Sequence, residues 1–323
     1  MTFTRSRQVS TNPHILLGMR AEGGLKTAPL RPLPRNRDVV LVANGKASGV
    51  ANGAIVDEAV RALRAHGAHV ELHRTASLAQ LPTAIEETDS RVVLLGGDGT
   101  LHAVANLPGP LPELALLPAG RANNVARSLG IPLELDRAAA LAVHGAARPL
   151  DAIDAQAGPR RYRAVEGVSV GFHAMARVKY RADNSAALLH GLTVGLETLR
   201  KFRPIDVVVE SNGEREVLTV GQLFASNLPL YGFGLRVAPE AEPADGELDL
   251  VTIEAPTRRS LVATIPRLRR GTHSRLPGVR TWRASHVRID PAGASPVVAD
   301  STNLGSGRVE LTLVPGALEM VTP

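Results

Sequence analysis

Continuous apolar runs alternate with segments of helical periodicity in the first half of the chain. Uninterrupted apolar runs are typical of strands buried on both faces of a sheet, whereas apolar residues spaced three and four apart indicate helices. The predicted order is strand 38–45, helix 54–67, strand 68–74, helix 78–88, then strands 91–95 and 114–120. Alternation of this kind favours a parallel sheet, so we expect a doubly wound α/β domain over residues 38–155.

Beyond this region the pattern changes to short alternating runs separated by turn residues, such as 205–211. This pattern predicts an antiparallel β-sandwich or barrel-like domain over 156–323, interrupted by one helix near 184–202. The pattern leaves open a return of the last segment to the first domain. Residues 1–37 hold several arginines, prolines and glycines but one acid, and we expect a flexible basic extension there.

Composition and charge narrow the class of protein. The chain has 323 residues, 44% hydrophobic and 21% charged, and no apolar run reaches the roughly 20 residues of a transmembrane helix. The opening residues lack a signal-peptide core and there are no cysteines, so we expect a cytoplasmic protein. The formal charge of +6 fits either a GC-rich genome or attraction to phosphates and anionic membranes. Only 3% of residues are aromatic and no recognition motif is present, which argues against nucleic acid as a partner.

Three glycines surround one carboxylate after the third predicted strand, in the segment Gly96-Gly97-Asp98-Gly99-Thr100. Glycines let the backbone turn sharply near a ligand, and the N–H groups that open the next helix suit a phosphate. A bare carboxylate would repel phosphate, so Asp98 is expected to act through Mg²⁺ or to accept a proton from an attacking hydroxyl. A tight turn with an aspartate cap is the structural alternative.

Two more glycine-containing loops follow strands of the same predicted sheet, at 44–49 and 118–132. The carboxyl ends of parallel strands lie at one edge, where α/β proteins bind ligands. Three such loops together predict a nucleotide cleft. None contains the Gly-Lys-Ser/Thr of a Walker loop.

The order of these motifs resembles the catalytic-domain family of the diacylglycerol kinases, specifically the bacterial soluble lipid kinases, over residues 38–323. The matching motifs are the Asn44 loop, Gly-Gly-Asp-Gly-Thr at 96–100, Pro118-x-Gly120-x-x-Asn123 and the segment APEAEPADGELD at 238–249. NAD kinases share the glycine motif, which makes an NAD kinase a further alternative. The last segment favours the lipid kinases.

The resemblance implies an ATP- and Mg²⁺-dependent kinase that transfers the γ-phosphate to a lipid hydroxyl, such as that of diacylglycerol. It also implies transient peripheral contact with an anionic membrane, and it leaves a homodimer open. The nucleotide-binding residues it implies are Asn44, Gly45, Lys46, Ser48, Gly49, Thr75, Gly96, Gly97, Asp98, Gly99, Thr100, Leu101, His102, Gly120, Arg121 and Asn123. The implied Mg²⁺ ligands are the Asp245 carboxylate and main-chain oxygens of Glu242 and Glu247, although Asp-Gly is also a common hairpin turn.

The chain departs from the family pattern at positions that bear on catalysis. The family has Asp-Gly-Glu near the end of the second domain, with the glutamate as proton acceptor, whereas this chain has Asp300-Ser301-Thr302. A threonine at Thr302 cannot act as a general base near neutral pH. Further departures are Arg121 for a threonine, Asn124 for an aspartate, His102-Ala103 for Asn-Glu, Glu166 for an asparagine and His173 for an aspartate.

Two functional interpretations follow from these departures. In the first, catalysis is rearranged: Asp98 and Asp300 remain as catalytic carboxylates, Arg121 binds a phosphate, and His102 shares proton transfer. In the second, the chain is a catalytically weakened nucleotide- or lipid-binding protein that regulates. Asp300 is the expected base under the first interpretation.

Two weaker signals remain. Residues 167–171, GVSVG, match the Gly-x-Ser-x-Gly motif of hydrolases, but Ser169 falls in the β-rich half rather than at an elbow of the parallel sheet. The densest basic stretch is either a solvated surface or a contact for anionic lipid headgroups. Its arginines are 258, 259, 267, 269, 270, 275, 280 and 283.

Overall fold

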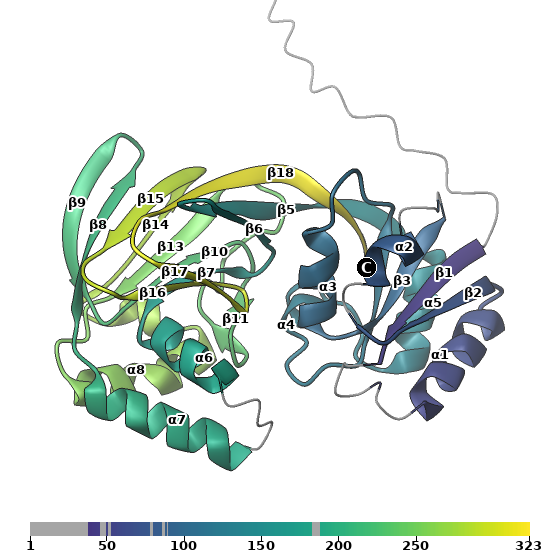
Figure 1. Cartoon of the computed structure of the whole chain (residues 1–323), viewed down its shortest axis with the longest axis horizontal. Helices are drawn as coiled ribbons and strands as arrows, with labels where there is room; N and C mark the ends of the chain where they lie inside the picture. Colours follow the sequence, from purple (N-terminus) through teal and green to yellow (C-terminus); the bar gives the residue numbers. More distant parts are fainter. Residues whose placement is uncertain are drawn as a thin grey trace, which may run out of the picture. The chain divides into compact units, whose positions relative to one another are not determined.

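Four parallel strands form one end of a ten-stranded sheet in the computed structural model, which describes residues 38–45, 50, 53–77, 80–85, 88, 90–182 and 188–323 (Figure 1). They are β1 (Asp38–Asn44), β2 (His69–Thr75), β3 (Arg91–Gly96) and β4 (Leu114–Pro118), in the order β2-β1-β3-β4. β3 is buried along its whole length, because helices cover both faces of the sheet. The expected doubly wound α/β arrangement is therefore confirmed.

Helices on the two faces complete this region. One face packs against α1 (Ala54–Ala65) and α5 (Leu135–His144), and the other against α2 (Leu81–Ile85), α3 (Asp98–Ala105) and α4 (Asn124–Ser128). The side chains of β3 alternate between the two cores, with Val92 and Leu94 on one side and Val93 and Leu95 on the other. α3 and α4 begin directly after the turns that follow β3 and β4, so their N-termini lie at the carboxyl edge of the sheet.

The second half is the antiparallel β-sandwich that the alternating pattern predicted. One sheet continues from the first half through β5 (Ala146–Ala157), β6 (Arg160–Ala164), β8 (Ile205–Ser211), β9 (Glu214–Val220), β15 (His286–Pro291) and β18 (Val309–Thr322). The other contains β7 (Gly167–Gly171), β10 (Gln222–Ser226), β13 (Leu248–Ile253), β14 (Val279–Ala284), β16 (Pro296–Ala299) and β17 (Thr302–Ser306). Val168, Leu223 and Leu250 from one sheet and Val287 and Leu311 from the other share the core between them. A two-strand hairpin, β11 (Leu230–Tyr231) and β12 (Leu235–Arg236), lies outside both sheets.

Two long strands belong to both halves of the fold. β18 pairs with β15 in the sandwich and with β4 in the parallel sheet, where Met320 lies opposite Leu114 (Figure 1). β5 runs antiparallel to β18 from the Ala146–Thr322 pair to the Gln156–Glu310 pair, with an irregularity between Val314 and Leu318. Main-chain hydrogen bonds thus connect the two halves without a linker.

The helices of the second half differ from the single helix expected near 184–202. Helical structure begins earlier, with α6 (Phe172–Ala182), and continues in α7 (Leu188–Lys201). A further helix, α8 (Arg258–Arg270), was not predicted, and a short 3-10 turn (His273–Arg275) follows it. Its arginines and Pro266 obscured the apolar periodicity, although Thr257 and Ser260 form a capping box and Gly271 ends the helix in a left-handed conformation.

α6, α7 and α8 cover the outer face of the six-stranded sheet (Figure 1). Phe224 and Val251 of the sheet pack there with Leu261 and Leu268 of α8 and with Phe202, which follows α7. Among the helices of the described residues, none combines the length and the apolar character needed to cross a bilayer.

Candidate active site

The turns after β1, β3 and β4 meet at one edge of the parallel sheet, as their glycines predicted. The Gly45 N–H donates to Thr75 O at 3.0 Å, which joins the turn after β1 to the end of β2. The Ala119 N–H donates to Gly96 O at 2.7 Å, which joins the turns after β3 and β4. Asn44, the last residue of β1, also bonds Thr100 of α3, so the described parts of these turns lie along one edge.

Two glycines allow the turns after β3 and β4 to touch. A Cβ on Gly97 would lie 2.8 Å from the Gly120 Cα, and one on Gly120 would lie 2.6 Å from the Gly97 Cα. Real Cβ atoms do not approach backbone so closely, so any side chain would push the loops apart. Asn123, in the left-handed region at φ 48°, braces the second turn because its side-chain amide bonds both Gly120 N and Gly120 O.

Several residues expected to bind nucleotide instead point into the protein. The Asn44 amide donates to Thr100 Oγ1 at 3.2 Å, and both side chains are buried. Leu101 lies in the core beneath the sheet, and Thr75 is buried against Ala43 O. Gly45, Gly99 and Arg121 are exposed, and Gly97, Asp98, Gly120 and Asn123 are half-buried. The expected residues Lys46, Ser48 and Gly49 lie outside the described residues.

Asp98 opens α3 at the edge of the three turns. Its Oδ1 accepts the Val125 N–H at 3.0 Å, so the carboxylate also caps the start of α4. The side chain is half-buried rather than enclosed, and the neighbouring Gly99 is exposed. This position is consistent with the predicted catalytic role, which stays a prediction.

A buried network that the sequence did not reveal connects α3 and α4 to the second half of the chain. His102 Nε2 lies 3.1 Å from Glu166 Oε1, and Asn124 Nδ2 donates to Glu166 Oε2 at 2.7 Å. The same Asn124 amide donates to Gly232 O at 2.7 Å. Asn106, at the end of α3, bonds both the N–H and the C=O of Arg163, which holds α3 against β6 and fixes the direction of His102.

Burial and charge shift the pKa values in this network strongly. Burial alone would lower the pKa of His102, but the carboxylates of Asp300 and Glu166 outweigh it and raise that pKa to about 9. Burial raises the pKa of Glu166 to about 7, against the opposing hydrogen bond and charge of His102. Perturbed titratable groups beside a ligand-binding edge are typical of functional sites.

Asp300, the expected base, is fully enclosed. Its carboxylate accepts three backbone N–H groups, from Val165 at 3.0 Å, Glu166 at 2.8 Å and Gly167 at 3.2 Å. Its Oδ2 also lies 3.5 Å from His102 Nε2, and its side chain has no exposed surface. These contacts favour a structural role for Asp300, which holds the start of β7 against the turn before Thr302.

The Asp245 turn is anchored by a buried aspartate that the sequence analysis missed. Asp151 on β5 accepts the Gly246 N–H at 2.9 Å with one carboxylate oxygen and the Gly316 N–H at 2.8 Å with the other. Asn227 then binds the Asp151 and Val165 carbonyls. The available signal was a carboxylate between apolar residues, in the segment Leu150-Asp151-Ala152.

A guanidinium lies at the carboxylates proposed to hold Mg²⁺. Arg283 Nη1 is 3.4 Å from Asp245 Oδ2 and 3.8 Å from Glu247 Oε2, and its Nε is 3.2 Å from Asp249 Oδ1. Arg283 also donates to the Glu240 carbonyl. No cluster of three carboxylate or imidazole ligands suited to a metal occurs in the part of the chain that the structure describes. With these side-chain positions the donor set does not fit a bound cation, because a fixed positive charge already neutralises it.

Ser169 of the hydrolase-like motif lies within β7, which is paired on both sides, and has no exposed surface. Its Oγ lies 3.0 Å from His173 Nδ1 and accepts the Tyr231 hydroxyl at 3.4 Å. Burial, aided by Arg177, lowers the pKa of His173 to about 4, so the ring is neutral. A closed serine in a central strand cannot attack a substrate, which disfavours a hydrolase.

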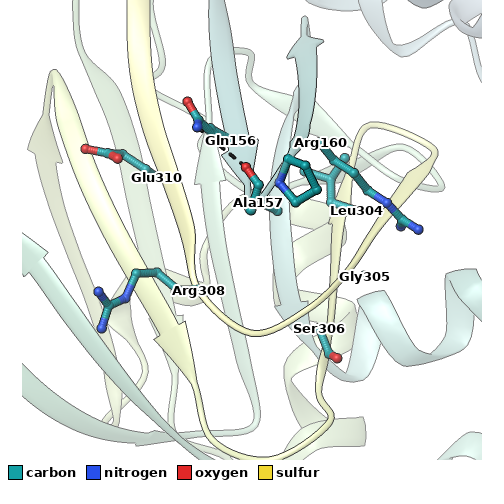
Figure 2. Close-up of a pocket in the computed structure, with 10 residues that line it drawn as sticks. Gln156, Ala157, Arg160, Leu304, Gly305, Ser306, Arg308 and Glu310 are labelled. Atoms are coloured by element: carbon teal, nitrogen blue, oxygen red, sulfur yellow. Dashed lines mark hydrogen bonds between the residues drawn. The ribbon is translucent and has the colours of Figure 1, made fainter.

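A cavity of about 590 Å³ lies elsewhere, between the β5–β6 and β17–β18 turns (Figure 2). Figure 2 shows Arg160, Ser306 and Arg308 around it. Arg308 is already paired with Asp290, and Glu310 with His286. None of the predicted site residues that the structure describes lines this cavity.

Comparison with known proteins gives the family. A model of the diacylglycerol kinase catalytic domain matches residues 38–155, and a model described as the YegS C-terminal NAD kinase beta sandwich-like domain matches residues 166–322. A "probable lipid kinase YegS-like" from Pseudomonas aeruginosa is 30% identical over 297 residues, which are 88% of this chain and 94% of that protein. A diacylglycerol kinase from Mycobacterium tuberculosis is 29% identical over 257 residues, 75% of this chain and 80% of that protein.

The fold also matches a solved structure. The crystal structure of a diacylglycerol kinase from Bacillus anthracis aligns with a TM-score of 0.67 at 17% identity, covering 90% of this chain and 98% of that one. Both halves of the sequence and the arrangement of strands thus agree with one family. The chain belongs to the diacylglycerol kinase family, among the YegS-like lipid kinases.

Proposed function

We propose that this protein is an ATP-dependent lipid kinase that transfers the γ-phosphate of ATP to a lipid hydroxyl, such as that of diacylglycerol. Residues 38–155 would bind the nucleotide, and 156–323 would bind the lipid. The observation that carries the proposal is the contact between the Gly97 and Gly120 turns, at the start of α3 and α4. This contact brings the N-terminal ends of two helices to one place, and the partial positive charge of helix N-termini suits a triphosphate.

Within this proposal Asp98 and Arg121 have separate roles. The half-buried Asp98 carboxylate would orient the reacting groups at the edge of the turns, and the exposed Arg121 would neutralise phosphate charge. Mg²⁺ would arrive with the phosphates of ATP and reduce their charge. No step is assigned to a cation at Asp245, because Arg283 already occupies that charge cluster.

The first experiment measures phosphate transfer from labelled ATP, with Mg²⁺, to a mixed lipid extract. The control is Asp98→Asn, which keeps an oxygen for the Val125 N–H but removes the charge. We expect a labelled lipid that disappears in the variant, and the product identifies the acceptor. ATP binding without any product would favour the regulatory alternative, and transfer to NAD would indicate an NAD kinase.

The outer surface of α8 supports the proposed contact with an anionic membrane. Val262 and Ile265 are exposed at 44% and 39%, and Arg259 and Arg269 lie on the same stripe at helical spacing. Over the described residues, no carboxylate forms an ion pair with the arginines of α8. Of the basic stretch expected to bind headgroups, Arg280 and Arg283 are instead paired with acids. Unpaired arginines beside exposed apolar side chains are typical of interfacial helices.

Vesicle sedimentation tests this surface. Arg259→Gln with Arg269→Gln should weaken binding to vesicles containing phosphatidylglycerol by about 10-fold or more, since each arginine contributes about 1 kcal/mol near an anionic surface. The matched control is Arg215→Gln with Arg288→Gln, whose guanidinium groups are ion-paired with Glu210. Vesicle binding that changes neither with salt concentration nor with the α8 substitutions would contradict the proposed contact.

A further inference from the structure

A kinase that phosphorylates an alcohol needs a group that accepts the hydroxyl proton. Thr302 cannot accept it, and the Asp300 carboxylate is occupied by three backbone N–H groups with no exposed side-chain surface. The proton acceptor must therefore be another carboxylate near the three turns. The candidates are Asp98 and Glu166.

Glu166 is hydrogen-bonded to Asp300, which lies two residues before the position that lost its glutamate. Its N–H donates to the Asp300 carboxylate at 2.8 Å, and the Asp300 N–H donates to Gly167 O at 2.8 Å. Thr302 begins β17 two residues after Asp300. Hydrogen bonds in both directions thus join the start of β7 to the Asp300 turn, which leads into β17, with β16 between the two strands in the sheet. Glu166 and Thr302 therefore lie on segments that meet at Asp300.

The Glu166 side chain is held in one position at that site. His102 Nε2 lies 3.1 Å from Oε1, and Asn124 Nδ2 donates to Oε2 at 2.7 Å. Asn124 follows Asn123 in the loop after β4, and His102 lies in the first turns of α3, after Asp98. Both contacts therefore come from the two turns proposed to hold the phosphates. The Glu166 side chain keeps 5% of its surface exposed, unlike that of Asp300.

We propose that Glu166 is the catalytic proton acceptor of this protein, in place of the glutamate that Thr302 replaces, and that His102 and Asn124 position it. The proposal rests on the proposed lipid kinase function. The step balances as follows: the lipid O–H bond breaks and its proton goes to Glu166. The hydroxyl oxygen forms a bond to the γ-phosphorus, and ADP leaves with the electron pair of the broken P–O bond.

The electrostatics of the pair suit this role. Burial raises the pKa of the Glu166 carboxyl to about 7, close to the operating pH at which a general base works best. Burial lowers the pKa of His102, but the neighbouring carboxylates raise it further, to about 9. The ring therefore stays protonated near neutral pH and is a poor base itself. His102 is therefore a positioning residue that keeps Glu166 ionised.

The test measures kcat as a function of pH for the wild type, Glu166→Gln and His102→Gln. Glu166→Gln should lower kcat by about 100-fold or more, with the KM for ATP changed by less than about threefold. In the wild type, kcat should fall at low pH with an apparent pKa near 7, as Glu166 becomes protonated. His102→Gln should move this acid limb to higher pH, because the positive charge of His102 stabilises the Glu166 carboxylate. Glu71→Gln, exposed on β2, is the control.

A reciprocal exchange separates catalysis from folding. Glu166→Asn combined with Thr302→Glu moves the carboxylate back to the segment after Asp300. The double variant should recover at least about 10-fold of the kcat that Glu166→Asn loses. A structural role for Glu166 would not be restored by a glutamate on another strand.

Each outcome discriminates. An active wild type together with an equally active Glu166→Gln, or an acid limb that His102→Gln leaves in place, overturns the assignment of the base alone. A wild type that forms no lipid product at any pH overturns the lipid kinase function and this assignment together. A loss of kcat in Glu166→Gln, together with its recovery in the Glu166→Asn, Thr302→Glu double variant, supports the lipid kinase function and the role of Glu166.

Discussion

Replacing His102 and Glu166 together by glutamine should remove most of the pH dependence of stability above neutral pH. His102 is buried between Glu166 and Asp300, and its pKa rises from 6.5 to about 9 on folding because these carboxylates outweigh the effect of burial. A folded protein that holds a proton more tightly than the unfolded chain loses stability as pH rises. The stabilisation is therefore complete below pH 6.5 and lost as pH passes through about 9.

The magnitude follows from the same two pKa values. The interval from 6.5 to about 9, at about 1.4 kcal/mol for each pH unit, corresponds to about 3 kcal/mol in the free energy of unfolding. Glu166, whose pKa burial raises from 4.5 to about 7, removes stability between those pH values. His173, whose pKa burial lowers from 6.5 to about 4, adds stability over nearly the same range. These two effects oppose each other, so the fall between pH 7 and 9 reports mainly His102.

The assay is urea unfolding followed by circular dichroism at half-unit steps from pH 6.5 to 9.5. The free energy of unfolding of the wild type should fall by about 3 kcal/mol, and that of the double variant His102→Gln, Glu166→Gln, which also removes the carboxyl whose pKa rises without His102, should change by less than about 1 kcal/mol. His69→Gln, an exposed histidine on β2, should behave as the wild type. A wild-type curve that is flat above pH 7, or a fall of equal size in the double variant, would refute the reasoning.

Three further outcomes test other contacts. Gly97→Ala should weaken ATP binding, measured by calorimetry, by about 10-fold or more because its Cβ meets the opposite turn, whereas Gly99→Ala, whose Cβ meets nothing within 4 Å, should change affinity little. Asp151→Asn leaves the N–H of Gly246 or of Gly316, each in a partly buried hydrogen bond, facing an amide N–H, and should cost about 1–2 kcal/mol in thermal unfolding. Asp154→Asn, in an exposed ion pair, should cost less than about 1 kcal/mol. The melting temperature should not respond to Mg²⁺ or a chelator in the wild type, and it should respond to Mg²⁺ in Arg283→Met, whose carboxylate neighbours lose their fixed cation.

The sequence predicted the α/β half well because its signals are local. Uninterrupted apolar runs marked β1, β3 and β4, and glycines after each strand marked the turns that meet at one edge. The sequence did not predict α8, because arginines separate its apolar residues and weaken the helical periodicity. Only the capping residues indicated a helix there. A search for caps as well as periodicity would have found it.

The partners of Glu166 could not be predicted, for a different reason. His102 and Asn124 reach it across 64 and 42 positions of sequence, and contacts of α3 and α4 with the second half of the chain, Asn106–Arg163 and Asn124–Gly232, bring them together. Sequence comparison showed which residues were unusual, including Glu166 and Thr302, but treated each as a separate departure. The structure connects Glu166 to Asp300 by a hydrogen bond, and under the proposed role of Glu166 the loss at Thr302 and the gain at Glu166 are one change.

The order in which the chain is synthesised has a consequence for folding. β4 is hydrogen-bonded to β18, where Leu114 lies opposite Met320, and about two hundred residues separate these partners. At translation rates of about 5–20 residues per second, β4 waits on the order of 10–40 s on the ribosome as an unpaired sheet edge. β5, which pairs with β18 along nearly all of its length, lacks this partner for about the same time. A nascent chain of this architecture therefore presents an exposed strand until its last segment emerges, and chaperones that cover such edges should set its yield more than the stability of the finished protein does.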